Sequence, residues 1–470
     1  MRRLNLSLYL FLMPLLPYIF VSGGCATTPT RLHIDGIQKT VKPLLTLGSV
    51  SEYRYSNGLT LLVYPDRNSP TIAYQTWYDV GSKDETPGYT GLAHLFEHMM
   101  FKKTKNLADG EFDRILDTAG AEGQNAFTTH DRTVYIQELP KERLELIIRL
   151  ESDRMANLII DEEAFKTERE VVQNERRLRT ENSPDGMMFQ EIFGLAYQTH
   201  PYRWPVIGYQ EDLNRMTATD ARAFYDRFYR PDRATIVVTG DINPDEVARL
   251  VKSYYESIQP RTSNTATSGK SSIEAELKGL KQKKIPFNIQ IEKLLIGFRS
   301  PPGASEDRAA LLVLDGILSG GKSSRFEKKL VETGIAAGAF SHWMEAEDPS
   351  LFLIGASLME NRISEEAESV ILRELETLQK ELVSDAEIKR VVKKIRFSLF
   401  EGLNSNAEIA NFLGESQSLY GDFTKGLTLI DDLSRIQPID VQRVSKKYFN
   451  LNSRVVLRGI PKTSKAGKSR

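Results

Sequence analysis

Two kinds of hydrophobic segment follow each other along the chain. Short runs rich in β-branched and aromatic residues, such as 59–64 and 72–80, predict strands, and turn residues at 65–68 join these two. Longer segments with apolar residues at helical spacing predict helices. The expected helices span 92–101, 110–118, 141–157 and 161 into the 180s, and a hairpin is expected from 124–128 with 133–139. Strands beside several helices, without strict alternation, indicate an α+β domain.

A helix end followed by a β-branched strand occurs twice. Residues 228–240 (FYRPDRATIVVTG) and 448–459 (YFNLNSRVVLRG) share this pattern, about 220 residues apart. The repeat predicts two domain-sized halves, joined by the Ser-, Thr-, Asn- and Gly-rich segment 260–272. In the second half, 294–298 predicts a strand, and 307–318 predicts a helix in the place of 92–101, but without histidine. The two halves are therefore expected to be chemically unequal.

Length and charge limit the possibilities. At 470 residues the chain is too long for one core. Its 62 basic and 63 acidic residues are balanced, so bulk electrostatics give no basis for nucleic-acid binding. The expected parts are a signal peptide (1–24), a tether (25–46), a site-bearing N-terminal domain (47–259), a linker (260–282), a homologous non-catalytic C-terminal domain (283–461) and a basic tail (462–470).

The amino terminus predicts export. Arg2 and Arg3 precede an apolar stretch, and the small residues 22–24 lead to Cys25, the only cysteine. This pattern resembles a bacterial lipoprotein signal, with cleavage before Cys25 and a lipid on that residue. Ala26 after the cysteine favours the outer membrane, so we expect a periplasmic, lipid-anchored chain in a Gram-negative cell. The alternatives are ordinary cleavage nearby or retention as a membrane anchor.

The pentapeptide 94–98 (HLFEH) carries the candidate chemistry. His94 and His98 are four residues apart, so on a helix they share one face and can bind one metal ion together. Glu97 is placed beside them, where a base acting on metal-bound water would stand. The alternative is two unrelated surface histidines on an acidic helix. Apolar residues on nearly the whole of the helix favour burial, and buried ionisable groups need partners such as a metal.

A catalytic zinc needs a third protein ligand. Glu168 and Glu175 are seven residues apart on one face of a predicted helix, and either could serve. The residues alone do not choose between them. A charged, solvated surface helix is the competing interpretation of this segment.

The segment 91–102 (GLAHLFEHMMFK) resembles the signature of the pitrilysin–insulysin metallopeptidase family, most closely its mitochondrial-processing-peptidase-like bacterial branch. In that family a glutamate about 76 residues beyond the motif completes the zinc site, and 76 residues lie between His98 and Glu175. The resemblance thus implies Glu175 as third ligand to one Zn²⁺ per chain and Glu168 as its supporting neighbour. It also covers the hairpin 123–139 and the segment 200–208, and it extends from about residue 51 to 460.

The resemblance implies an α+β fold of two homologous domains. Each would be a mixed, mostly antiparallel sheet with helices packed on one face, and the two would close as a clamshell. It implies a zinc-dependent endopeptidase that cleaves short or unfolded peptides in an enclosed chamber, with Glu97 as general base on zinc-bound water. Asn125 and Ala126 match the family's edge strand, to which a peptide substrate would add. A plain turn is the competing reading of Asn125.

The match breaks in the second half. The family places an arginine and a tyrosine seven residues apart there, and in this chain those positions fall on Leu330 and Ala337. Unless Arg325 substitutes, we expect a zinc-bearing subunit whose related partner chain supplies the pair, with a homodimer as the other arrangement. The competing function is a non-catalytic scaffold or peptide-binding subunit of an envelope complex.

Overall fold

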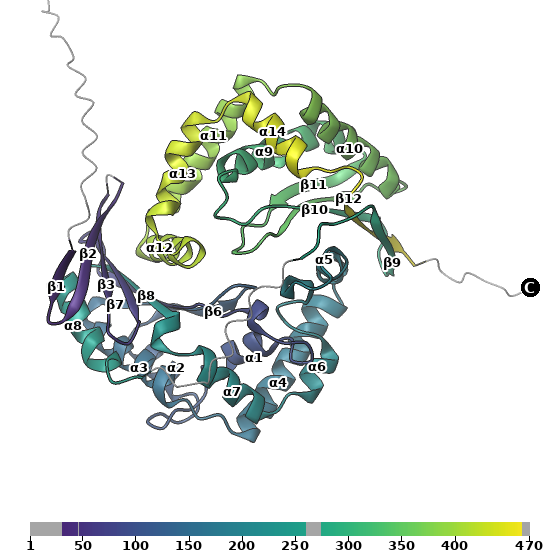
Figure 1. The fold of residues 1–470 in the computed structure, drawn as a ribbon. Coiled ribbons are helices and arrows are strands. Elements are labelled where there is room, and N and C mark those ends of the chain that lie inside the picture. Colours follow the sequence, from purple (N-terminus) through teal and green to yellow (C-terminus); the bar gives the residue numbers. More distant parts are fainter. Residues whose placement is uncertain (1–30, 46, 260–273, 463–470) are drawn as a thin grey trace, which may run out of the picture.

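Two β-sheets, one from each half of the chain, organise the fold (Figure 1). The computed structural model describes residues 31–45, 47–259 and 274–462. The first sheet has the order β1-β2-β3-β4-β8-β5-β7-β6 and the second β11-β12-β10-β13-β9. Only β4 with β8 and β13 with β9 pair in parallel among the strands described, so both sheets are mixed and mostly antiparallel, as expected.

The strands lie at these positions: β1 Arg31–Ile34, β2 Ile37–Leu44, β3 Gly48–Arg54, β4 Thr60–Pro65, β5 Thr71–Tyr78, β6 Glu122–Thr128, β7 Thr133–Pro140, β8 Ala234–Gly240, β9 Lys281–Phe287, β10 Lys293–Arg299, β11 Ala336–Trp343, β12 Leu351–Leu358 and β13 Val455–Pro461. The helices lie at these: α1 Leu92–Met99, α2 Glu111–Thr118, α3 Leu144–Asn157, α4 Glu162–Arg176, α5 Pro184–Ala196, α6 Gln210–Arg215, α7 Ala218–Phe228, α8 Pro244–Tyr255, α9 Arg308–Ser319, α10 Ser364–Lys380, α11 Asp385–Glu401, α12 Asn406–Tyr420, α13 Thr424–Arg435 and α14 Pro438–Tyr448. No described helix is long and apolar enough to span a membrane.

The repeated helix–strand unit is present in both halves. It consists of α7 with β8 in the first half and α14 with β13 in the second, and each strand has one parallel neighbour. The main core of each half lies between its sheet and its own helices, and α1 and α9 hold similar places in the two cores. Each Leu, Ile or Val buried in this way stabilises the fold by about 1.5–3 kcal/mol.

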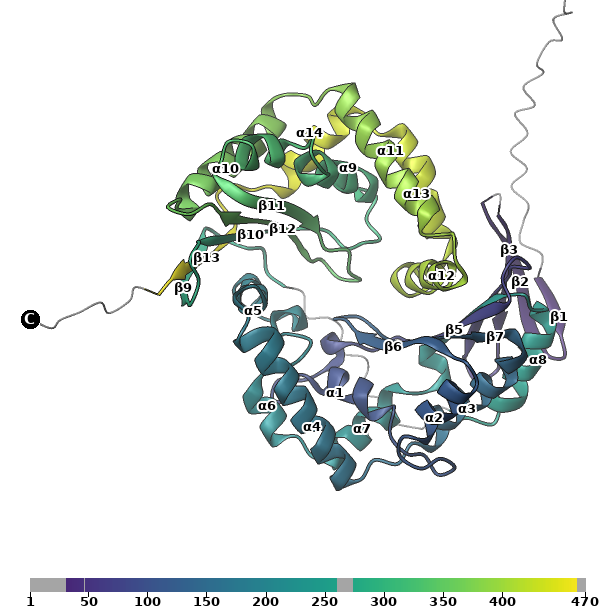
Figure 2. The same cartoon turned by 180° about the vertical axis from the view of Figure 1, so that it is seen from behind.

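The second face of each sheet is covered by a helix from the other half. Helix α12 packs on the first sheet against Trp77 and Val237, and α5 packs on the second sheet against Leu353 and Leu457. Figure 2 shows the same exchange from behind. The expected α+β fold with helices packed on one face of each sheet is confirmed, and the exchanged helices α12 and α5 add cover to the other face. Apolar residues on both faces of the central strands require cover on both sides.

The expected tether needs a correction. Within 25–46, the residues 31–44 form the strands β1 and β2, and β2 pairs with β3 from Gln38 with Arg54 to Leu44 with Gly48. Ile37 and Leu44 are buried at the two ends of β2. Strands β1 and β2 therefore extend the first sheet, held by backbone hydrogen bonds and by these buried side chains. Cys25 and the signal segment lie outside the described residues.

Candidate metal centre

The helix that carries both histidines begins at a fixed place. Gly91 precedes it with a φ of 93°, which favours glycine, and a Cβ there would lie 2.6 Å from the carbonyl oxygen of Ile207. The Glu85 carboxylate accepts hydrogen bonds from the N–H groups of Gly91 and Ala93 at 2.9 and 2.8 Å. These bonds satisfy donors that a helix N-terminus leaves free. The contacts therefore fix the direction of the side chains on α1.

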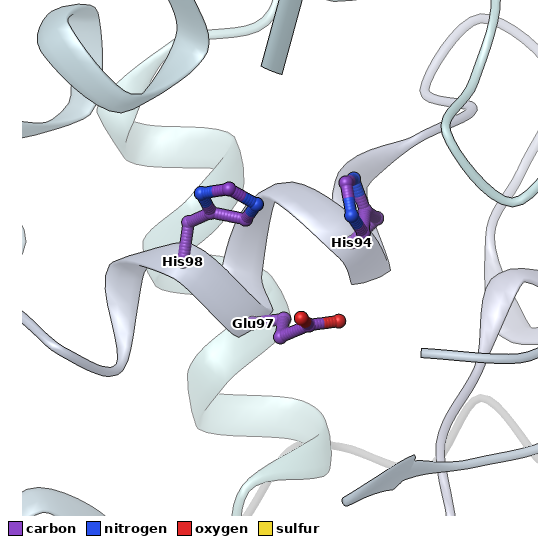
Figure 3. A group of neighbouring side chains, drawn as sticks. All are labelled: His94, Glu97 and His98. Atoms are coloured by element: carbon purple, nitrogen blue, oxygen red, sulfur yellow. The ribbon is translucent and has the colours of Figure 1, made fainter. Parts of the chain in front are cut away.

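Three side chains of α1 form one group. The potential ligand atoms of His94, Glu97 and His98 all lie within 4.8 Å of one another. Figure 3 shows the two imidazole rings along α1 with the Glu97 carboxylate beside them. His94 and Glu97 are buried and His98 is half-buried. The spacing in the sequence thus produces the expected shared face.

Glu175 reaches the same place from α4, which packs against α1. Its Oε2 lies 3.8 Å from His94 Nε2 and 3.5 Å from His98 Nε2. Two ligand atoms on one tetrahedral zinc, each roughly 2.0–2.1 Å from the ion, are about 3.3 Å apart. The two distances from the Glu175 oxygen to the imidazole nitrogens are each within about 0.5 Å of that value. The donor set of two imidazoles and a carboxylate fits a zinc ion.

Glu168 lies about two helical turns before Glu175 on α4. It contacts the other nitrogen of His98. Its Oε2 lies 3.4 Å from His98 Nδ1, and Lys102 Nζ lies 2.7 Å from its Oε1. Burial would raise the pKa of Glu168, but the hydrogen bonds from His98 and Lys102 lower it. An ionised carboxylate at Nδ1 orients the ring and leaves Nε2 to face Glu175. The structure thus places the two glutamates on different nitrogens of one histidine.

The surroundings set the protonation of each group. Burial lowers the pKa of His94 to about 4, which leaves a neutral ring with a free lone pair. Burial alone would also lower the pKa of His98, but its bonds to Glu168 and Glu175 raise it to about 9. A metal bound at Nε2 would compete with that proton.

Glu97 has a different partner from either of the other glutamates. Its Oε2 accepts a hydrogen bond of 2.5 Å from the Thr128 hydroxyl at the end of β6. Burial raises the pKa of Glu97, although the Thr128 bond opposes the rise. A carboxylate with raised proton affinity beside a metal position is suited to accept and return a proton.

Two cavities flank the centre. One of about 440 Å³ is lined by Glu97, His98 and the strand β6, including Asn125 and Ala126. The other, of about 500 Å³, is lined by His94 and Glu175 together with aromatic side chains of α5. Strand β6 is the last in its sheet, so one side of its backbone has no strand partner among the described residues. Asn125 and Ala126 therefore lie on an open edge next to the centre.

The positions of the missing Arg/Tyr pair carry no polar replacement. Leu330 is fully buried in the core of the second half, and Ala337 is exposed on the edge strand β11. Arg325 donates to Glu387 at 3.0 Å and lies 3.7 Å from Glu374, both in the second half. Its charge is balanced there.

Sequence reasoning did not find three polar contacts of this site. Thr128 bonds Glu97, Lys102 bonds Glu168, and Arg179 Nη1 lies 2.6 Å from Glu175 Oε1. Arg179 follows Glu175 by four positions in a continuous helical run, a spacing that could have indicated it. Lys102 lies after the end of α1, so helical spacing gave no signal for it. Thr128 offered no such signal, because the contact depends on how the hairpin folds over α1.

The chain is similar to proteins described as peptidases over most of its length. The family described as Insulinase (Peptidase family M16) matches residues 61–209, and the Peptidase M16 inactive domain matches 215–395. The zinc protease PqqE of Helicobacter pylori is 33% identical over 400 residues, covering 84% of this chain and 88% of that protein. The uncharacterized zinc protease YmxG of Bacillus subtilis is 25% identical, with 84% and 94% covered.

Solved structures share the fold. A protease from Helicobacter pylori superposes with a TM-score of 0.83 at 30% identity, covering 87% of this chain and 99% of that one. A peptidase M16 inactive domain from Pseudomonas fluorescens superposes with a TM-score of 0.78 at 17% identity, covering 88% and 98%. The second likeness concerns the fold alone.

Proposed function

The chain belongs to the insulinase family of peptidases, family M16, and from this premise we propose that it is a zinc endopeptidase of the inverted H-x-x-E-H type. His94, His98 and Glu175 hold the ion, and Glu97 is the general base. One observation carries the proposal: Nε2 of both histidines lies within 3.8 Å of the same Glu175 oxygen, with Glu97 alongside.

The side chains of the site have different roles in the proposed reaction. A zinc ion held here would supply Lewis-acid polarisation of the scissile carbonyl and of water. The Glu97 carboxylate takes a proton from the attacking water and passes it to the nitrogen of the leaving amine. Thr128 keeps that carboxylate in place through its hydroxyl. Glu168 holds the His98 ring by its Nδ1.

The open edge of β6 and the two cavities indicate how a peptide would bind. Main-chain hydrogen bonds to β6 at Asn125 and Ala126 would hold an extended segment and read backbone more than side chains. The cavity beside His94 has apolar and aromatic walls, with Phe189, Phe193 and Trp204 among them. A large apolar side chain next to the scissile bond fits this cavity. Short or unfolded peptides meet both requirements.

We also propose a second chain in the active enzyme. Leu330 is sealed in a core and Ala337 has no polar group, so this chain offers no substitute at the Arg/Tyr positions. A related chain with that pair, and without the histidines, would complete the site. Mixing the two purified chains should raise peptide hydrolysis well above that of either alone. Full activity of this chain by itself would contradict a two-chain enzyme.

The site itself is tested by replacing Glu97→Gln. The amide keeps the size of the side chain but cannot take the proton, so hydrolysis should fall by about 10²–10⁴-fold. Zinc content, measured by elemental analysis, should stay near one per chain. The exposed Glu170→Gln is the matched control. Undiminished turnover in Glu97→Gln would contradict the role of Glu97 as general base. A native chain that is fully loaded with zinc but cleaves no peptide, with or without a partner, would favour the peptide-binding alternative.

The place of action is a proposal from the sequence. Cleavage before Cys25 and lipid attachment there would hold the mature chain at the periplasmic face of the outer membrane. Mass spectrometry of the membrane fraction should find a lipid-modified N-terminal Cys25, and an unmodified mature terminus elsewhere would contradict it.

A further inference from the structure

Helix α11 carries an exposed face that the peptidase site does not use. It lies on the outer side of the second half, away from α1 (Figures 1 and 2). The exposed side chains Lys389, Lys393, Arg396, Phe397 and Phe400, here named the α11 stripe, recur at helical spacing. At 3.6 residues per turn they fall within an arc of about 100° and extend over about 16 Å. The opposite side of α11 supplies Ile388 and Val391 to the core of the second half.

The aromatic side chains of the α11 stripe are unusually open to solvent. Phe397 is 63% exposed, more than any other aromatic side chain in the described part of the chain, and Phe400 is 45% exposed. The three tryptophans, in contrast, are at most 4% exposed. An isolated exposed apolar residue needs no explanation, but two aromatics on one helical face beside cations form a pattern.

The cations of the α11 stripe form no ion pair within the described residues. Within the described residues, Lys389, Lys393 and Arg396 form no salt bridge or side-chain hydrogen bond, and no acidic side chain lies inside the arc between them. Neighbouring cations are engaged: Lys380 lies 3.5 Å from Glu376, and Lys394 donates to the Gly320 carbonyl. The stripe therefore presents a positive charge that an anionic surface would neutralise.

We propose that the α11 stripe docks the chain on an anionic phospholipid surface. Long Lys and Arg side chains can reach headgroup phosphates while the phenylalanine rings enter the boundary with the acyl chains. The stripe lies on an exposed helix face and lines none of the described cavities, so it offers cations and rings without a shaped recess, as a fluid lipid surface requires. Docking by α11 would set how the enzyme is oriented at a membrane, whether or not Cys25 is lipidated.

The experiment uses tryptophan as a depth probe in the full-length chain. Phe397→Trp is reconstituted with vesicles of brominated phosphatidylglycerol or of brominated phosphatidylcholine. Bromine quenches indole fluorescence only at close range, and the three native tryptophans are buried. We expect at least twofold stronger quenching in the anionic vesicles, and loss of that difference in 1 M salt, where the Debye length is about 3 Å. Leu178→Trp, at a 71% exposed position in the first half, should not be quenched in either lipid.

Charge reversal completes the test. Lys389→Glu, Lys393→Glu and Arg396→Glu, combined with Phe397→Trp, should abolish the anionic preference without altering hydrolysis of a soluble peptide. Equal quenching in both lipids, or quenching that survives charge reversal, would overturn the proposal. So would the absence of quenching together with a fluorescence shift on adding polyglutamate, which would point to an acidic protein partner. The quenching results do not depend on the zinc site.

Discussion

Glu97 and Glu168 both lie near His98, and their surroundings give the two carboxyl groups different proton affinities. Burial raises the pKa of Glu97, whereas hydrogen bonds from His98 and Lys102 lower that of Glu168. One carboxylate is therefore suited to carry a proton, and the other remains ionised and holds a ring in place. Residue type alone does not distinguish them, because both are buried glutamates beside the same histidine.

The role of Glu168 can be measured apart from catalysis. Glu168→Gln keeps the shape but removes the charge that orients His98 Nδ1, so zinc affinity should fall by about 10–100-fold. Competition with a chelator at fixed pH measures this directly. Glu170→Gln, two residues away and exposed, should bind zinc as the native chain does. Equal affinity of both variants would mean that the contact with His98 is incidental.

At the residue scale, local spacing predicted which side chains of α1 lie together. The i, i+4 spacing placed His94 and His98 on one face, because helix geometry is local. The choice between Glu168 and Glu175 needed either the family resemblance or the fold, since it depends on how α4 lies on α1. Thr128 could not be predicted, because its contact with Glu97 depends on the position of a hairpin far along the chain.

Helix α12 approaches the first sheet closely enough to exclude any side chain at one position. A Cβ on Gly414 would lie 2.1 Å from the Trp77 ring. The indole also donates to Gln75 at 2.9 Å and is buried, so it cannot simply turn away. Glycine is therefore required here by space.

Gly414→Ala should destabilise the protein although alanine is the better helix former. The gain in helix propensity is about 1 kcal/mol, but the added methyl overlaps Trp77, and overpacking costs about 1–3 kcal/mol. Thermal unfolding followed by circular dichroism should show a lower Tm. Gly194→Ala in α5, whose Cβ would meet only an ordinary contact at 3.7 Å, should leave the Tm unchanged or slightly raised. A Tm for Gly414→Ala at or above the native value would contradict the close packing.

Most elements followed from local pattern, and the features that were missed depend on contacts between distant parts of the chain. The hairpin of β6 and β7 and the helices α2, α3 and α4 were expected close to where they lie. Strand β2 was expected to be tether because its polar residues and Pro43 give little apolar signal, yet β3 pairs with it through the backbone. The exchange of α5 and α12 was not expected, since a helix pattern does not say which sheet receives its apolar face.

The two halves also meet through charged groups. Lys83 lies 3.1 Å from Asp131 in the first half and forms an ion pair with Glu347 of the second. Asp131 also accepts hydrogen bonds from the Tyr202 hydroxyl at 2.6 Å and from the Glu347 backbone at 3.1 Å. Burial, with the Asp131 charge nearby, raises the pKa of Glu347 to about 7 although Lys83 opposes the rise.

The raised pKa of Glu347 has a definite effect on stability. The unfolded chain releases this proton near pH 4.5 and the folded chain near pH 7, so between these values the folded state binds more protons and stability falls as pH rises. Relative to Glu347→Gln, the native chain should lose stability from about pH 4.5 to about pH 7 and then keep a constant difference. Urea unfolding across that range gives the comparison.

The matched control for this titration is Glu360→Gln, an exposed position of the second half. Its stability should follow the native profile at every pH. A difference between native chain and Glu347→Gln that does not vary with pH would show that Glu347 titrates normally in the folded state.

The central claim is that one zinc ion binds between α1 and α4. Diffraction from crystals of the zinc-loaded chain, measured on both sides of the zinc absorption edge, locates the ion without assumptions about chemistry. The account predicts a single strong anomalous peak per chain, about 2.0–2.2 Å from Nε2 of His94, Nε2 of His98 and a Glu175 oxygen. A peak bound elsewhere, or none near these three side chains in a fully loaded chain, would contradict it.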